Sequence, residues 1–270
     1  LLHRQLLSQS PNRHLLSVPL VFADALARMR DDFHHRWLFG FLSVVPQRTR
    51  CRLMGVTSGT RGGNVFFFKD GEAQKIALTI DDAPSQSVEH FRQLLDVLKE
   101  SRVHVTFQVI SGHASTEEHV DLLRRAVQEG HQLTNHSTKD EKCLGLTEEE
   151  FEERVDACQA FIERISPGAR KWFRPPSGFM NATMRRVLLR KGYEVCLGDC
   201  FSSDPRVDDV DFHVRTLSRA VRGGSILIVH CPESTCRQQT LELIPRLASE
   251  LRNLDFEFAT LDELFFGTAE

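Results

Sequence analysis

The sequence lacks the features that define several classes of protein. No apolar run reaches the length of about twenty residues that crosses a bilayer, and the stretch Trp37–Val45 falls far short of it. The net charge is −3 and no basic block is interleaved with aromatic residues, so nothing indicates nucleic-acid binding. Seven cysteines without a CxxC pair are too few for a disulfide scaffold, although Cys196 with Cys200 and Cys231 with Cys236 lie close enough to pair. The composition, 41% hydrophobic and 26% charged, is that of an ordinary globular enzyme.

Charge is distributed unevenly along the chain. Residues 1–70 hold ten arginines or lysines and four aspartates, whereas the remainder is acidic. We therefore divide the chain into an N-terminal extension of unknown role over residues 1–60 and a single large domain over residues 61–270. At this length the domain can bury one sizeable core.

The N-terminus gives weak information on targeting. The chain begins at Leu1 rather than at methionine, so we expect its natural start to be missing. Residues 1–23 contain no acidic residue and resemble a signal or transit segment, which Pro19 and Asp24 interrupt. This slightly favours the secretory pathway and otherwise leaves the location open.

Short β-rich runs alternate with longer amphipathic segments from Lys75 onward. The predicted strands are Ile76–Ile80, Val103–Ile110, Gln132–Thr134, Trp172–Phe173, Tyr193–Leu197, Ser225–Val229 and Phe256–Ala259. The predicted helices are Val88–Lys99, Thr116–Gln128, Thr147–Ile165, Ala182–Arg190, Val210–Val221 and Gln238–Arg252. Such alternation implies parallel strands joined by helical crossovers. About seven units in roughly 200 residues predict an α/β fold of the (β/α) barrel type, distorted or incomplete, rather than an open doubly wound sheet.

Polar residues follow most of these strands. They are Asp81 and Asp82, Asn135 and His136, Arg174, Asp199 and His230. In a barrel the carboxyl ends of the strands converge on one face, so these side chains are expected to be neighbours. Adjacent carboxylates beside a core are costly without compensation. The pair Asp81-Asp82 therefore indicates a metal, a basic partner or a proton-transfer task, with a helix cap as the simpler alternative.

His136 and Asp140 add a second part of the pattern. They are four positions apart, which brings both side chains to one side of a helical turn or of a loop with similar pitch. Together with Asp82 they supply one nitrogen and two carboxylates. That set suits one divalent metal ion, zinc before cobalt or nickel, with an open position for water.

Five motifs in a fixed order carry a family resemblance. They are Thr79–Pro84 (TIDDAP), Val105–Phe107 (VTF), His136–Asp140 (HSTKD), Arg174–Gly178 (RPPSG) and Ile228–His230 (IVH). This set resembles the signature of the polysaccharide deacetylases, the NodB-homology or carbohydrate esterase family 4 enzymes, which include chitin deacetylases. The likeness extends from about Lys75 to Leu264. Ala83 replaces the usual glycine and a fourth family motif is distorted, a variant that resembles a eukaryotic chitin-deacetylase-like branch.

The resemblance implies roles for the central residues. Asp82, His136 and Asp140 would hold the metal, and Asp81 would be the base that takes a proton from the attacking water. Arg174 would orient Asp81 and keep it ionised. His230 would be the general acid that protonates the leaving amine.

The resemblance also implies which residues contact the substrate. Ser177 stands where the family usually has tyrosine, whose backbone N–H helps to hold the oxyanion. In the distorted motif, Asp199 or Asp204 would support His230, with Asp199 taken as the catalytic residue, and Phe201 would supply an apolar wall. Ile228, from the last motif, would also contact the substrate.

From these residues we expect a metal-dependent hydrolase that removes acetyl groups from an N-acetylated polysaccharide or oligosaccharide such as chitin. Its partner would be a carbohydrate, with no nucleic acid and no membrane span, and its oligomeric state stays open. One alternative is a related barrel amidase that acts on a small non-sugar amide. Another is a catalytically silent carbohydrate-binding relative, against which the presence of every predicted acid, base and ligand argues.

Overall fold

The structure is a computed structural model that describes residues 64–267 of the 270-residue chain. The extension predicted over residues 1–60, with its basic charge and signal-like segment, lies outside the described residues. Within residues 64–267 no helix is both long and apolar enough to span a bilayer. The same part of the chain contains no disulfide, so neither Cys196 with Cys200 nor Cys231 with Cys236 is bonded.

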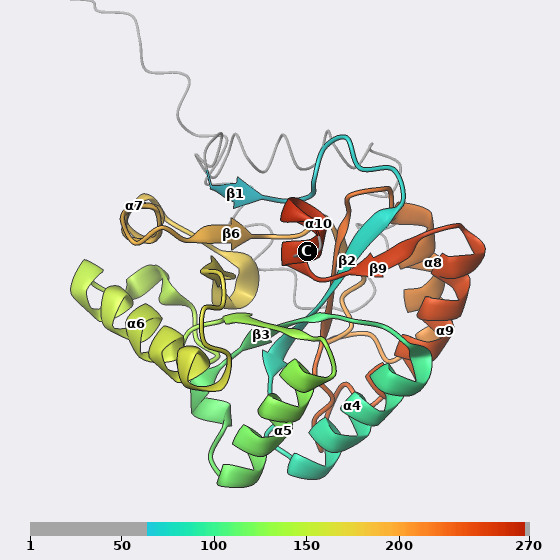
Figure 1. The fold of residues 1–270 in the computed structure, drawn as a ribbon, viewed down its shortest axis with the longest axis horizontal. Coiled ribbons are helices and arrows are strands. Elements are labelled where there is room, and N and C mark those ends of the chain that lie inside the picture. Colours follow the sequence, from blue (N-terminus) through green and yellow to red (C-terminus); the bar gives the residue numbers. More distant parts are fainter. Residues whose placement is uncertain (1–63, 268–270) are drawn as a thin grey trace, which may run out of the picture. The chain divides into compact units, whose positions relative to one another are not determined.

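The described residues form a sheet of nine strands (Figure 1). The strands are β1 (Val65–Phe66), β2 (Lys75–Ala83), β3 (Thr106–Val109), β4 (Gln132–Asn135), β5 (Trp172–Phe173), β6 (Glu194–Cys196), β7 (Cys200–Phe201), β8 (Ile226–His230) and β9 (Glu257–Ala259). Their order in space is β1-β6-β5-β4-β3-β2-β8-β7, with β9 also paired to β2. Each of these pairings is parallel. The prediction of an incomplete (β/α) barrel is confirmed, with β1 and β7 at the two ends of the strand order.

Helices surround this sheet on the outside (Figure 1). They are α4 (Val88–Ser101), α5 (Glu117–Gln128), α6 (Glu148–Ile165), α7 (Ala182–Arg190), α8 (Val210–Ala220) and α9 (Thr240–Asn253). Their apolar faces are buried, as Phe91 on α4 and Leu247 on α9 show. The short α10 (Leu261–Phe266) instead lies near the centre of the view, in contact with β2 and β9. Helix α6 begins with a capping box, in which the Thr147 hydroxyl accepts from Glu150 N and the Glu150 carboxylate accepts from Thr147 N.

Strand β2 is the central element, because it pairs with β3, β8 and β9. Ile76, Leu78 and Ile80 on this strand are at most 1% exposed. A strand covered on both faces needs a continuous apolar run, and this is the run that the sequence shows before the two aspartates. The strand thus carries Asp81 and Asp82 from the core to the carboxyl-end face of the barrel.

The predicted strands and helices are all present, with boundaries shifted by a few residues. Three elements were not predicted: β1, β7 and α10. The two strands have only two residues each and are defined by their pairing with β6 and β8. The apolar pattern does not mark these two strands, although it marks β5, which is equally short.

Candidate active site

Asp81 lies at the carboxyl end of β2, where Arg174 holds it. Arg174 Nη1 donates to Asp81 Oδ1 at 2.5 Å and to Thr79 Oγ1 at 2.8 Å. Arg174 Nε donates to the backbone oxygen of Cys196 at 2.9 Å. Burial lowers the pKa of the Arg174 guanidinium, but the carboxylate of Asp81 outweighs burial and raises this pKa overall. The Arg174 guanidinium therefore compensates the carboxylate of Asp81, and its hydrogen bonds to Thr79 Oγ1 and to the Cys196 backbone oxygen fix its position.

Asp82 reaches the same space as Asp81, although neighbouring side chains of a regular strand point to opposite faces. Its φ is 63°, and the β2–β3 register shifts between Ile80 and Ala83. The irregular backbone breaks the alternation at this point. As a result, His136 Nε2 lies 3.6 Å from Asp82 Oδ1 and 4.0 Å from Asp81 Oδ2.

His136 follows β4 and presents one defined nitrogen to these carboxylates. Its Nδ1 lies 2.7 Å from the backbone oxygen of Arg174, which can only accept, so Nδ1 carries a proton. Nε2 therefore faces Asp82. Burial lowers the pKa of His136, but Asp82 and Asp81 outweigh burial and raise it overall.

Arg237 is a second cation in the site, and the sequence did not identify it. Its Nη1 donates to Asp82 Oδ2, and it lies in the loop between β8 and α9. Burial raises the pKa of Asp82, but hydrogen bonding to His136 and the nearby charges of His230 and Arg237 lower it overall. Each aspartate of the pair thus has its own arginine. The sequence had indicated a basic partner as one possibility without showing which residue it would be.

His230 is supported by Asp204. His230 Nδ1 lies 3.1 Å from Asp204 Oδ1, and the backbone N–H of His230 donates to Asp204 Oδ2 at 2.8 Å. Burial alone lowers the pKa of His230, but the negative charge of Asp204 outweighs it and raises this pKa to about 9. His230 is therefore protonated near neutral pH, as a general acid must be.

Asp199 is placed elsewhere, and this corrects its prediction as a catalytic residue. Its carboxylate accepts from Ile226 N at 2.9 Å and from Ser225 Oγ at 3.3 Å, at the amino end of β8. His230 is at the opposite end of the same strand. Burial raises the pKa of Asp199 to about 7. The sequence offered Asp199 and Asp204 equally as the support of His230. In the structure Asp199 contacts the beginning of β8 and Asp204 contacts its end at His230.

The proposed base and acid lie side by side. Asp81 on β2 is the register partner of His230 on β8. On the other side of β8, Phe201 pairs with Ile228, and the Phe201 ring centroid is 5.9 Å from that of His230. Phe201 and Ile228 are partly exposed, so the structure leaves apolar surface beside the acid.

Ser177 is exposed in the 3-10 turn Pro176–Gly178 after β5. Its φ is 64°, a left-handed conformation that is uncommon for serine. Such strained residues are often found at functional sites, where the backbone must point a group in one direction. The turn directly follows Arg174 and its proline, which ties the position of Ser177 to the buried ion pair.

The residues expected to bind a metal do not all converge. Asp82 and His136 are buried together, but Asp140 is exposed, and residues 64–267 contain no cluster of three histidines, cysteines or acids with metal-binding geometry. The loop after His136 does not continue the helical pitch on which the prediction depended; it forms the short 3-10 turn η2 (Cys143–Gly145) further on. The donors present in this structure therefore do not fit a three-ligand metal centre.

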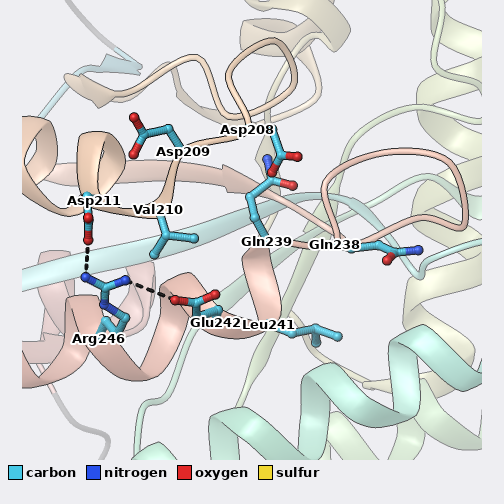
Figure 2. Close-up of a pocket in the computed structure, with 9 residues that line it drawn as sticks. All are labelled: Asp208, Asp209, Val210, Asp211, Gln238, Gln239, Leu241, Glu242 and Arg246. Atoms are coloured by element: carbon cyan, nitrogen blue, oxygen red, sulfur yellow. Dashed lines mark hydrogen bonds and ion pairs between the residues drawn. The ribbon is translucent and has the colours of Figure 1, made fainter.

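A hollow of about 560 Å³ borders the loop that carries Arg237 (Figure 2). It is lined by Asp208, Asp209, Val210, Asp211, Gln238, Gln239, Leu241, Glu242 and Arg246. Arg246 donates to Glu242 at 3.0 Å and to Asp211. Gln239 Nε2 donates to the backbone oxygen of Asp204 at 3.0 Å. The hollow thus lies next to Asp204, the residue that supports His230. None of the predicted catalytic residues lines it.

Comparison with known proteins finds relatives of one kind. The family model described as polysaccharide deacetylase matches residues 68–196. The chain is similar to a peptidoglycan-N-acetylglucosamine deacetylase of Bacillus cereus, with 26% identity over 198 residues that cover 70% of this chain and 87% of the relative. It is also similar to a chitooligosaccharide deacetylase of Rhizobium leguminosarum bv. trifolii, with 28% identity over 203 residues, 70% of this chain and 91% of the relative.

A solved structure of a deacetylase-family domain is also similar to this chain. The Xyl-CE4 domain of a multidomain xylanase from the hindgut metagenome of Trinervitermes trinervoides matches with a TM-score of 0.64 and 25% identity. The match covers 72% of this chain and 90% of that domain. Residues 68–196 thus match the polysaccharide deacetylase family, the NodB-homology proteins of carbohydrate esterase family 4, and the relatives found are deacetylases of that kind.

Proposed function

We propose that the domain hydrolyses the acetamide group of an N-acetylated polysaccharide or oligosaccharide and releases acetate. The observation that supports this most strongly is the pairing of Asp81 with His230 across β2 and β8. The neighbours of both residues suit these proposed roles. Arg174 stabilises the charged carboxylate of Asp81, and Asp204 raises the pKa of His230 to about 9.

The proton transfers follow from this arrangement. Asp81 accepts a proton from water while the water oxygen bonds to the acetyl carbonyl carbon, whose π electrons move onto the carbonyl oxygen. The tetrahedral intermediate then collapses, the C–N bond breaks, and His230 gives its proton to the departing nitrogen. The products are a free amine and acetic acid, which ionises to acetate. Asp81 then releases its proton to solvent and His230 takes one up, which restores both residues.

Three further residues are proposed to position the substrate. The backbone N–H of Ser177 would donate to the oxyanion, for which serine serves as well as tyrosine. Phe201 and Ile228 would contact the acetyl methyl group or the sugar face, since both leave apolar surface beside His230. We propose a β-linked N-acetylglucosamine chain, as in chitin, as the substrate, in line with the substrates named for the two relatives.

A bound divalent ion would polarise the acetyl carbonyl and acidify the attacking water. Zinc, with cobalt or nickel as alternatives, stays a prediction for Asp82, His136 and Asp140. Because Asp140 is exposed and Arg237 occupies one oxygen of Asp82, the steps above assign no task to a metal.

The contact between Arg237 and Asp82 favours a second candidate, a catalytically silent protein that binds N-acetylated carbohydrate. Such a protein would retain the apolar surface of Phe201 and Ile228 while a metal site is closed by an internal ion pair. The small-molecule amidase stays an alternative in substrate only, since it would use the same acid and base.

Acetate release from chitin oligomers tests the proposal. The wild-type protein is assayed with added zinc and, separately, with a chelator, beside Asp81→Asn and beside Asp255→Asn as control. Asp255 is exposed and has a φ of 62°, which asparagine also adopts readily. We expect Asp81→Asn to lower turnover by about 10²–10⁴-fold and the control to match wild type.

Each outcome decides between the candidates. Equal activity of wild type and Asp81→Asn would overturn the assignment of the base. Binding of chitin oligomers without acetate release in either zinc or chelator would establish the silent candidate, and hydrolysis restricted to small amides would establish the amidase.

A further inference from the structure

The ion pair between Arg237 and Asp82 is a built feature of the site. Both side chains are largely buried, with exposed fractions of 12% for Arg237 and 6% for Asp82. The pKa of Arg237 is lowered by burial but raised overall by Asp82. The charge on Asp82 is therefore already compensated by the protein itself.

Several contacts hold the loop of Arg237 in place. Glu233 Oε1 accepts from the backbone N–H of Gln86, which joins this loop to the segment after β2. Glu233 and Cys236 form a backbone bridge within the loop. On its other side, Thr240 Oγ1 donates to the backbone oxygen of His230 at 3.0 Å. Arg237 is thus presented to Asp82 from a loop that is tied to both neighbouring strands.

The position of Arg237 conflicts with metal binding at Asp82. A divalent ion at Asp82 and His136 would share the carboxylate with a guanidinium and would be repelled by its charge. Arg237 Nη1 donates to Asp82 Oδ2, so a metal ion bound through that oxygen would have to displace the guanidinium, while His136 Nε2 lies 3.6 Å from Asp82 Oδ1.

We propose that Arg237 is the resident cation of this site, which neutralises Asp82 and keeps divalent metal ions from binding there with high affinity. The proposal concerns the site of the proposed function, but it depends on the ion pair and not on catalysis. It also gives a physical reason why Asp140 does not have to reach the site: the buried carboxylate is compensated without a third ligand.

Zinc titration followed by calorimetry, with cobalt(II) absorption as a second probe, tests this proposal on the full chain. Arg237→Met removes the charge and keeps much of the length of the side chain. We expect this variant to bind one zinc ion at least about tenfold more tightly than wild type, as expected when a competing buried charge is removed. Arg237→Lys, which keeps the charge, should bind as weakly as wild type.

The matched control is Arg246→Met. Arg246 also pairs with carboxylates, Asp211 and Glu242, but on the exposed side of α8 and α9. The Arg246→Met variant should bind zinc with the same affinity as wild type. Tight zinc binding by wild type, unchanged in Arg237→Met, would overturn the proposal.

Thermal unfolding without metal covers the case in which Arg237→Met folds poorly. We expect Arg237→Met and Asp82→Asn each to lower Tm, and the double variant to lower it by less than the sum of the two, because it leaves no buried charge alone. Additive effects would show that the two side chains do not interact and would also overturn the proposal. Acetate release is measured separately, so a failure of the proposed function leaves these outcomes interpretable.

Discussion

The two adjacent aspartates of β2 are compensated in different ways. The arginine of Asp81 comes from the strand end after β5, is 2% exposed, and makes further hydrogen bonds to Thr79 and to a backbone oxygen. The arginine of Asp82 comes from a surface loop and is 12% exposed, and its buried Nε has no hydrogen-bond partner. The first pair belongs to the core of the barrel. The second lies at its rim, where another cation can compete for the carboxylate.

The largest effect expected from this difference is on stability. Arg174→Met leaves Asp81 buried without its partner and should lower the free energy of unfolding by about 3–5 kcal/mol. Arg237→Met removes the more exposed of the two arginines, 12% against 2% for Arg174, and should cost only about 1–3 kcal/mol. Urea unfolding monitored by circular dichroism measures both. Equal losses would mean that the two pairs are buried to the same energetic extent, and the distinction between core and rim would fail.

A second expected effect concerns the acid opposite Asp81. His230 is protonated below its pKa of about 9, so deacetylation should fall as the pH rises through that value. Asp204→Asn removes the charge that raises this pKa. The alkaline limb of the pH–rate profile should then move from about 9 toward the ordinary value of 6.5. An unchanged alkaline limb in Asp204→Asn would show that another group sets it.

The smallest effect is expected at Asp199, the other aspartate beside β8. Asparagine can still accept from Ile226 N, at the end of β8 opposite His230. Turnover and the alkaline limb should both stay close to wild type. Because burial raises the pKa of Asp199 to about 7, the folded state binds its proton more tightly than the unfolded state. The free energy of unfolding should therefore fall as the pH rises from about 4 to 7, and Asp199→Asn should weaken this dependence.

Much of the fold could be read from the sequence. The apolar run before Asp81, the capping box at Thr147 and the alternation of strands and helices each depend on neighbours in the chain, so local patterns predicted them. The site was also partly predictable, because parallel strands bring their carboxyl ends to one face. Asp81, His136, Arg174 and His230 do converge there.

Other features depended on contacts between distant segments. Asp204 and Asp199 lie five residues apart, and only the pairing of β7 with β8 shows which one reaches His230. Arg237 comes from a loop about 155 residues from Asp82, and no local pattern marks it. The predicted place of Asp140 assumed a helical pitch that the loop after His136 does not follow.

The sequence by itself indicated the barrel and the four side chains that meet at its carboxyl-end face, because periodic burial and strand direction are local properties of the chain. Its five motifs carried the family resemblance. The tertiary structure decided which charge compensates which. In each case it selected between groups of similar chemistry: Arg174 or Arg237, Asp204 or Asp199, and a metal or a guanidinium at Asp82. Distance and burial separate them, and both arise only when the chain has folded.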